Sequence, residues 1–563
     1  MASSTSSSSS STPFPKWQII IGVGAAGAIG ISYWYLKSGR SPLFNSIFRG
    51  TSQESSEESA ESKGRVSIET PFELAQKLKA EGNQLFKNGK YDEAIQCYNK
   101  AIAACPEEQT NDLATFYQNR AAAYEQLKKW SSVIADCSKA IDLNAKYEKA
   151  LFRRAKAREI VKDWENCLDD ITCVCLLQNF QNSSALLMAD RVLKELGKMH
   201  AKEAMKTRKI IMPSKNFILT YLSSFSEDPV SKSLLEVDPP LGQGDLKGFL
   251  KAKLAFATEK YDEIIPACTE EINSSESDSA YIAESLSLRA SFYFLCGQFD
   301  EATQDLTTII NNEDYDYKIR VNALIKRASI YMQTEKLQEC LNDYETAVDL
   351  GPNISDVFHH RGQVKLLIDK TNDARDDFQK AVTLNPNFPI AYVQKLYTDY
   401  RYALQKQDTE LLIENMSNFR KATEKFPDCS ESFVLFAQVL TERENFEEAN
   451  NMYEKALKLN PNNASIFVHK GLLLLQWKND IQGSVKLMRE AIDLDKKCEF
   501  AYETLGTVEV QRGNLLLAIE LFNKAIELAR SEMEMTHLFS LRDAATSQLK
   551  ITTKLGIVSQ LNS

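Results

Sequence analysis

The sequence predicts an all-α protein: a superhelical solenoid of paired helices in two halves, preceded by one transmembrane helix. Three observations support this fold class. Glycine and proline are scarce, with 21 and 15 among 563 residues, which argues against a β-rich fold with many tight turns. Small residues recur at intervals of about 34 positions over most of the chain. One uncharged stretch near the N-terminus has the length of a membrane span.

The composition and the charge exclude several other classes. Hydrophobic residues at 43% and charged residues at 26% are typical of a folded chain, and the net charge of −10 argues against a nucleic-acid partner. Residues 1–250 contain 32 Lys and Arg against 29 Asp and Glu, whereas residues 251–563 contain 35 against 48. The two parts are therefore near +3 and −13, and we expect them to meet different partners.

The segment 17–36 is the predicted transmembrane anchor, and it follows a Ser-rich tail at residues 1–16. Its twenty uncharged positions match a hydrocarbon core of about 30 Å at a rise of about 1.5 Å per residue. Lys37 and Arg40 follow the span, so the positive-inside rule keeps the C-terminal body in the cytosol. A cleaved signal peptide is the alternative, but its small-residue triplet at 26–28 lies in the middle of the apolar stretch.

The rest of the chain divides into four parts. Residues 37–68 are rich in Ser and Glu and are expected to form a flexible tether. Three repeats are predicted in residues 69–180 and a second array of seven or eight in residues 245–563. Between them, residues 181–244 lack the repeat pattern and contain several Pro and Gly residues close together, which is typical of a connecting region.

The repeats have the spacing of the tetratricopeptide repeat. In this motif small residues let the two antiparallel helices of a unit approach closely, and larger apolar residues seal the unit against the next one. Later units preserve the period: Ala328 and Gly362 are 34 residues apart, and so are Ala437 and Gly471. Residues 391–426 are expected to hold a degenerate unit. The first unit shows the full pattern, with Gly82, Leu85, Ala94, Tyr98, Ala101 and Pro106.

Five polar residues on the first helices of the N-terminal repeats form a candidate binding site. Lys79 and Asn83 are four residues apart and share one helix face, as do Lys149 and Arg153. Asn119 occupies the same repeat position as Arg153, one period earlier. Cationic and amide groups that converge on a groove bind carboxylates, because both kinds of side chain donate hydrogen bonds to them.

This set resembles the carboxylate clamp of tetratricopeptide co-chaperones. The pattern Lys79-x-x-Gly82-Asn83, Asn119-Arg120 and Lys149-x-x-x-Arg153 is complete. The resemblance implies that the groove binds the C-terminal Glu-Glu-Val-Asp of the seventy- and ninety-kilodalton heat-shock chaperones. A solvated charged face is the alternative interpretation of these residues.

The combination of anchor, tether, clamp and longer array resembles the family of seventy-kilodalton import receptors of the mitochondrial outer membrane, in its animal form. Segments that carry the likeness include residues 150–157, 468–471 and 501–514. The family resemblance implies a receptor that takes hydrophobic preproteins, chiefly inner-membrane metabolite carriers with internal signals, from chaperones. It implies that the receptor passes them to the translocase pore with other subunits of that complex.

The register of the repeats predicts which residues of the second array face its groove. Glu431 and Glu503 are placed to meet basic residues of a cargo signal, although an ordinary hydrogen bond between repeats is the competing interpretation. The predicted groove positions are His360, Glu431, Gln438, His469 and Glu503.

Two rival functions differ in testable ways. A membrane-anchored co-chaperone of another organelle, the endoplasmic reticulum or a plastid, would use the same clamp. An enzyme carrying repeats would need a separate catalytic domain of about 250 residues, and no interval of that size is free of repeats.

The sequence contains no H-E-x-x-H motif, phosphate loop or triad-like set, so we predict no catalytic residue, no metal and no cofactor. The eleven cysteines include no C-x-x-C pair and are expected to be packing residues in a reducing compartment.

Overall fold

The computed structural model describes residues 70–230, 234, 246–274 and 281–556. These residues form twenty-five α-helices and one short 3-10 helix, and no strand occurs among them. The predicted anchor at 17–36 and the tether at 37–68 lie outside the described residues. No helix in the described part of the chain is long and apolar enough to cross a membrane.

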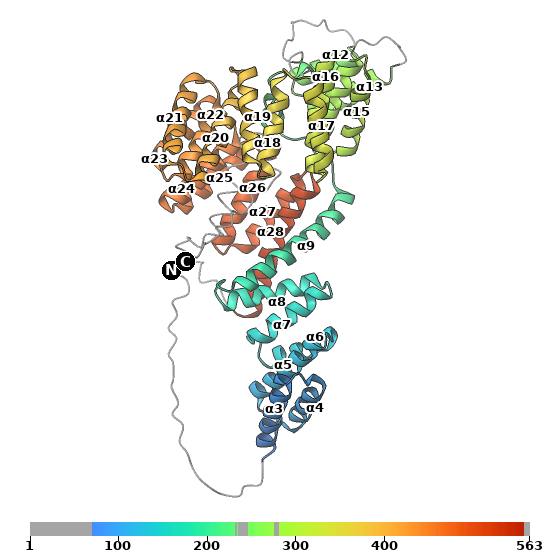
Figure 1. Ribbon diagram of the computed structural model, residues 1–563, viewed down its shortest axis with the longest axis vertical. Coiled ribbons are helices and arrows are strands. Elements are labelled where there is room, and N and C mark those ends of the chain that lie inside the picture. The colour runs from blue at the N-terminus through green and yellow to red at the C-terminus, as the bar shows by residue number, and fades with distance from the viewer. Residues whose placement is uncertain (1–69, 231–233, 235–245, 275–280, 557–563) are drawn as a thin grey trace, which may run out of the picture. The chain divides into compact units, whose positions relative to one another are not determined.

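Consecutive helices pair as antiparallel hairpins, as the 34-residue period predicts (Figure 1). The fold divides into two compact units. Among the described residues, we call 70–206, 509–523 and 536–556 the N-terminal unit, and those within 207–508 and 524–535 the array unit.

The N-terminal unit begins with three helix pairs, where three repeats were expected. A long helix, α9, follows them in the region that the sequence predicted to be a connection. The helices are α3 (Pro71–Lys87), α4 (Tyr91–Ala104), α5 (Thr110–Gln126), α6 (Trp130–Leu143), α7 (Glu148–Ile160), α8 (Trp164–Leu177) and α9 (Ser183–Thr207).

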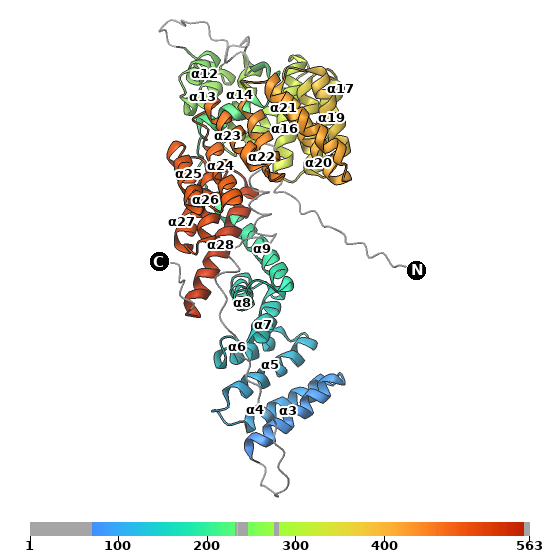
Figure 2. The ribbon, with the colours of Figure 1, turned by 90° about the vertical axis from the view of Figure 1, so that its left-hand side faces the viewer.

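The array unit contains the remaining pairs, and its helices α16 and α17 lie side by side in both views (Figures 1 and 2). The helices are α10 (Lys215–Ser223), α12 (Gly248–Ala257), η2 (Tyr261–Glu263), α13 (Ile264–Ile272), α14 (Ile282–Leu295), α15 (Phe299–Asn311), α16 (Tyr317–Gln333), α17 (Leu337–Leu350), α18 (Ser355–Leu367), α19 (Thr371–Leu384), α20 (Pro389–Lys406), α21 (Thr409–Lys425), α22 (Ser430–Glu442), α23 (Phe446–Leu459), α24 (Ala464–Lys478) and α25 (Ile481–Leu494). The last three helices, α26 (Glu499–Gln511), α27 (Leu515–Leu528) and α28 (Glu532–Lys554), contribute residues to both units.

Small residues bring the two helices of a pair together. A Cβ atom on Gly82 would lie 2.7 Å from the ring of Tyr98, so only glycine lets α3 and α4 approach this closely. In α18 the same role falls to Gly362, where a Cβ would lie 3.1 Å from the ring of Phe378. The two glycines occupy corresponding repeat positions, which explains why the period was visible in the sequence.

A buried Arg–Asp pair joins the two helices of several repeats. In α7 and α8, Arg154 donates to both carboxylate oxygens of Asp170, at 2.8 and 2.7 Å. The two residues are sixteen positions apart. Bidentate geometry of this kind fixes one side chain against the other, so the pair sets the register of the hairpin. The same spacing recurs in Arg120–Asp136, Arg289–Asp305, Arg327–Asp343 and Arg361–Asp377.

In the N-terminal unit, the C-terminal part of α28 packs on α8 and α9. Gly197 permits close contact, because a Cβ there would lie 2.5 Å from the carbonyl oxygen of Thr536. His200 Nδ1 lies 2.8 Å from Asp543 Oδ2, and Ser547 donates to Asp169 at 3.0 Å. The end of the chain therefore closes the repeat stack that carries the predicted clamp.

Candidate functional site

The five predicted clamp residues come from the first helices of three successive repeats. Lys79 and Asn83 lie on α3, Asn119 on α5, and Lys149 and Arg153 on α7. Lys149 is exposed and the other four are partly exposed, so all five are open to water. Since first helices stack next to one another in a solenoid, a ligand that lies across them meets residues from each repeat.

Asn83 and Asn119 are in direct contact. Asn119 Nδ2 donates to Asn83 Oδ1 at 3.1 Å, and the hydroxyl of Tyr98 donates to the same oxygen at 2.8 Å. Because the carbonyl oxygen of Asn83 is used twice, the remaining hydrogen-bonding group of this side chain is its NH₂. That group is a donor, which suits a carboxylate ligand.

Lys79 provides a cation near this amide pair. Its Nζ lies 5.7 Å from the centre of the Phe116 ring, within the range of a cation–π contact. No carboxylate among the described residues lies within ion-pair distance of the Lys79 ammonium group. The charge of Lys79 is therefore available to an anion.

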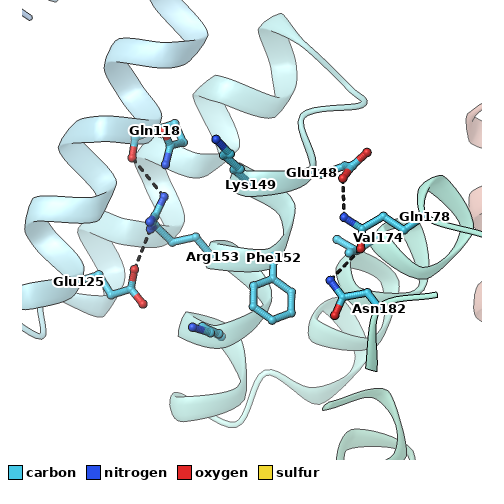
Figure 3. Close-up of a pocket in the computed structure, with 10 residues that line it drawn as sticks. Gln118, Glu125, Glu148, Lys149, Phe152, Arg153, Val174, Gln178 and Asn182 are labelled. Atoms are coloured by element: carbon cyan, nitrogen blue, oxygen red, sulfur yellow. Dashed lines mark hydrogen bonds and ion pairs between the residues drawn. The ribbon is translucent and has the colours of Figure 1, made fainter. Parts of the chain in front are cut away.

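Lys149 and Arg153 line a pocket of about 330 Å³ (Figure 3). The pocket is lined by residues of α5, α7 and α8 and by Asn182, just before α9, so the connecting region contributes to the site. Three of the lining residues are cations and two are carboxylates. The lining residues are Gln118, Glu125, Glu148, Lys149, Phe152, Arg153, Lys156, Val174, Gln178 and Asn182.

Arg153 is held on one side of this pocket by α5. Its Nε donates to Glu125 Oε2 at 2.7 Å, and its Nη1 lies 3.5 Å from the carbonyl oxygen of Gln118 (Figure 3). Gln118 and Glu125 are two helical turns apart on one face of α5. The guanidinium is thus oriented before any ligand is present.

Amide side chains form the other side of the pocket. Gln178 donates to Glu148 Oε2 at 2.5 Å, and Asn182 donates to Gln178 Oε1 at 2.7 Å. Lys156 lies 5.2 Å from the centre of the Phe152 ring. The pocket therefore combines an apolar wall with cations and amides, a lining that suits a short acidic peptide with an apolar residue.

The sequence predicted Lys149 and Arg153 but missed the other eight lining residues. Part of the signal was present, because Phe152 and Lys156 follow Lys149 at spacings of three and seven and so share its helix face. Glu125 and Gln178 carried no such signal. They reach the pocket from other helices, and only the packing of α5 and α8 on α7 shows their position.

The predicted groove residues of the array unit have a different environment. His360, Gln438, His469 and Glu503 are buried, and Glu431 is partly exposed. Gln438 Nε2 lies 3.4 Å from His469 Nε2, so two of the predicted residues contact each other. Their assignment to a cargo site stays a prediction, and Glu431 is the member most open to a ligand.

A segment of the chain itself covers His360. The ring of Phe225, in the loop after α10, lies 4.4 Å from the His360 ring. The backbone amides of Ser226 and Glu227 donate to Asp356, both at 2.9 Å. This segment, Phe225–Asp228, therefore packs against the face of α18 that carries Asp356 and His360.

Charged groups hold the Phe225–Asp228 segment in place. Asp228 forms an ion pair with Lys326 of α16 at 2.9 Å, and both side chains are almost fully buried. Burial raises the pKa of Asp356 to about 6, against the effect of its hydrogen bonds. Burial also lowers the pKa of His360 to about 4, so His360 is neutral near pH 7.

An acidic cluster surrounds Glu503 at the end of the array unit. Burial and the nearby carboxylates of Glu534 and Glu503 raise the pKa of Glu499 well above its ordinary value. Arg530 partly balances this charge, because its guanidinium lies 3.5 Å from Glu534. A raised pKa favours the protonated form of Glu499, and Glu503 and Glu534 are buried, so the cluster offers little negative charge to a ligand from solution.

The described residues contain no group of three or more His, Cys, Asp or Glu side chains that could hold a metal ion. All eleven cysteines lie in the described part of the chain as free thiols, and nine of them are buried. Burial raises the pKa of Cys167 to about 12, so this thiol has little nucleophilic character at neutral pH.

Comparison with known families identifies the repeats. The sequence matches the TPR repeat family over residues 82–128 and 437–476, and the tetratricopeptide repeat family over residues 321–354.

Comparison with individual proteins extends the likeness to nearly the whole chain. The human mitochondrial import receptor subunit TOM70 is 44% identical over 570 residues, which cover 96% of this chain and 93% of the human protein. The crystal structure of the yeast Tom70 is 25% identical, covers 86% of this chain and 99% of that chain, and gives a TM-score of 0.49. The first TPR of Spaghetti (RPAP3), solved with an HSP90 peptide SRMEEVD bound, is 37% identical, covers 23% of this chain and 98% of its own, and gives a TM-score of 0.21.

Proposed function

Because this chain belongs to the TOM70 family of mitochondrial import receptor subunits, we propose that its N-terminal repeats dock a cytosolic chaperone whose client the array then receives. The protein is a receptor and not an enzyme, as the family and the tetratricopeptide fold establish. The mitochondrial family favours this organelle over the endoplasmic reticulum or a plastid.

The pocket around Arg153 supports chaperone docking. A C-terminal Glu-Glu-Val-Asp segment presents a terminal α-carboxylate, acidic side chains and one apolar side chain. Arg153 and Lys149 provide the cations, Asn83 provides an amide donor, and Phe152 provides an apolar surface. Hydrogen bonds to charged groups are among the stronger polar contacts, so this set of residues suits the ligand in charge.

The array unit is proposed to receive the hydrophobic preproteins, among them the inner-membrane metabolite carriers. Glu431 supports this, because it is a partly exposed carboxylate on α22 that can meet Lys or Arg of an internal signal. Residues 251–563 contain more acidic than basic residues, which also favours the binding of a basic signal.

We propose that residues 17–36 cross the outer membrane once and leave the repeats in the cytosol, where chaperones deliver their clients. In that position the receptor passes the preprotein to the translocase pore and contacts other subunits of that complex.

One experiment tests both halves of the proposal. The full-length chain in detergent micelles is titrated with a fluorescent peptide that ends in Glu-Glu-Val-Asp and, separately, with a segment of a carrier preprotein. We expect both to bind. Arg153→Ala should weaken binding of the chaperone peptide by about 1.5–3 kcal/mol, the range for a charge-assisted hydrogen bond. Binding of the carrier segment should not change.

Arg191→Ala is the matched control, since Arg191 is exposed and lies outside the pocket. Equal affinity of the chaperone peptide for the Arg153→Ala variant and the unaltered chain would refute the clamp. If Arg153→Ala abolished binding of both the chaperone peptide and the carrier segment, the proposal of two separate sites would be wrong.

A further inference from the structure

Arg153, the central cation of the pocket, already holds a carboxylate of its own chain. Glu125 Oε2 accepts from Arg153 Nε at 2.7 Å, a short charge-assisted hydrogen bond (Figure 3). Both side chains are about four-fifths buried, with exposed fractions of 22% and 23%. An ion pair with this degree of burial is screened less than a pair on the surface.

The pair leaves Arg153 only partly available. A guanidinium has five N–H donors, and here Nε faces Glu125 while Nη1 faces the carbonyl oxygen of Gln118. A ligand carboxylate that approaches Arg153 therefore meets the remaining donors beside an anion that is already bound. Two carboxylates at one guanidinium repel each other.

The charges of the pocket show what Glu125 changes. Three cations line it, Lys149, Arg153 and Lys156, against two carboxylates, Glu125 and Glu148. Glu148 accepts from the neutral Gln178 amide and so takes no cation out of use. Glu125 is the carboxylate that neutralises a cation of the site.

We propose that Glu125 is a built-in competitor that stands in for the partner's carboxylate on Arg153 and must give way when the partner binds. This inference rests on the proposed docking of an acidic C-terminus. Glu125 lowers the affinity of the site for its partner and raises the rate at which the partner dissociates. A receptor that hands its client on after docking needs such reversible binding.

The effect of the competitor depends on the charge of the ligand. A peptide that ends in aspartate brings two carboxylates to the clamp, whereas a peptide whose last side chain is neutral brings one. Repulsion by Glu125 acts on the negative charges of the ligand, so its removal should favour the more acidic peptide.

Glu125→Gln tests the competitor directly, since glutamine keeps an acceptor for Arg153 Nε and removes the charge. The full-length chain in micelles is titrated with the Glu-Glu-Val-Asp peptide and with a matched peptide that ends in asparagine. We expect the acidic peptide to bind about five- to tenfold more tightly and to dissociate more slowly. The asparagine peptide should change by less than about twofold.

Glu148→Gln is the matched control, because it removes a carboxylate from the same pocket without freeing a cation. Its effect on the acidic peptide should be smaller than that of Glu125→Gln. The gain should also disappear in an Arg153→Ala background, which a change in folding alone would not produce.

The outcomes separate this inference from the proposed function. If the unaltered chain binds the acidic peptide and Arg153→Ala loses it, while Glu125→Gln binds with equal or lower affinity, Glu125 is not a competitor and the clamp stands. If the acidic peptide does not bind the unaltered chain, or if Arg153→Ala leaves binding unchanged, the docking proposal itself fails.

Discussion

The N-terminal unit and the array unit use the same repeat position in opposite ways. In the N-terminal repeats, polar residues of the first helices stay open to water and line a pocket of about 330 Å³ around Lys149 and Arg153. At the corresponding position of the array, His360 lies beneath Phe225 and is 4% exposed. Register alone therefore does not distinguish a binding residue from a packing residue.

The difference arises from what covers each first helix. The Phe225–Asp228 segment satisfies Asp356 with two backbone amides and Lys326 with a buried carboxylate. At α7, the residues before α9 contact Glu148 through Gln178 but leave Arg153 in an open pocket, where it meets Glu125 from the neighbouring first helix. The same repeat position is therefore a pocket in one unit and a packing contact in the other.

The largest expected effect tests the feature that the two units share, the Arg–Asp pair inside each repeat. Asp170→Asn leaves Arg154 of α7 without its charged partner and removes one of the two carboxylates that pair with Arg158, and breaking a buried pair costs about 3 kcal/mol or more. Asp377→Asn does the same to Arg361 and Lys365 of the array. Hydrogen exchange should accelerate in α7 and α8 for the first variant and in α18 and α19 for the second.

Asp92→Asn is the control, since its pair with Lys129 is exposed and should change stability by less than about 0.5 kcal/mol. Unaltered exchange in α7 and α8 of Asp170→Asn would show that apolar packing alone fixes the repeat.

Much of the fold was predictable because packing demands small residues at fixed intervals. Gly82 and Gly362 each face an aromatic ring within about 3 Å of a hypothetical Cβ, so the period had to appear in the sequence. The degenerate unit expected at 391–426 is a complete helix pair, α20 and α21, whose helices are longer than those of most repeats. Residues 181–244 showed no period because α9 and α10 do not form a repeat hairpin.

The candidate site was less predictable, and the reasons are physical. Asn83 and Asn119 are 36 residues apart, close to one repeat period, and they are in contact. Glu125 is 28 residues from Arg153, which is not a repeat spacing, and it reaches Arg153 through the packing of α5 on α7. The cover over His360 depends on a loop 130 or more residues earlier, which no local pattern of α18 records.

A second prediction uses pH to test how well His360 is covered. Its pKa is lowered to about 4 in the folded chain and is near 6.5 when unfolded, so the unfolded state binds more protons between these values. Stability from this group is therefore present above pH 6.5 and is lost as the pH falls. Between pH 7.5 and 5.0 the loss is about 2 kcal/mol.

Comparison with His360→Gln isolates this group from Asp356 and Lys326, which face it. At pH 7.5 the variant should be less stable by about 1 kcal/mol, because glutamine does not fill the space beneath Phe225. At pH 5.0 the order should reverse in urea denaturation followed by circular dichroism. An equal gap at both pH values would mean that His360 titrates normally and that the segment above it opens readily.

The smallest expected effects come from one variant in each unit, one that changes peptide binding and one that changes stability. Lys149 is exposed at the pocket, so Lys149→Ala should change the free energy of unfolding by less than about 0.5 kcal/mol. The same variant should weaken binding of the acidic peptide by about 1 kcal/mol. Gln438 is 3% exposed and contacts His469, so Gln438→Ala should lower stability by about 1–2 kcal/mol and leave peptide binding unchanged. If Gln438→Ala instead kept full stability and lost the carrier segment, the inner face of the array would be a binding surface at that helix. Its repeats would then behave like those around Arg153, and the cover over His360 would be a local exception.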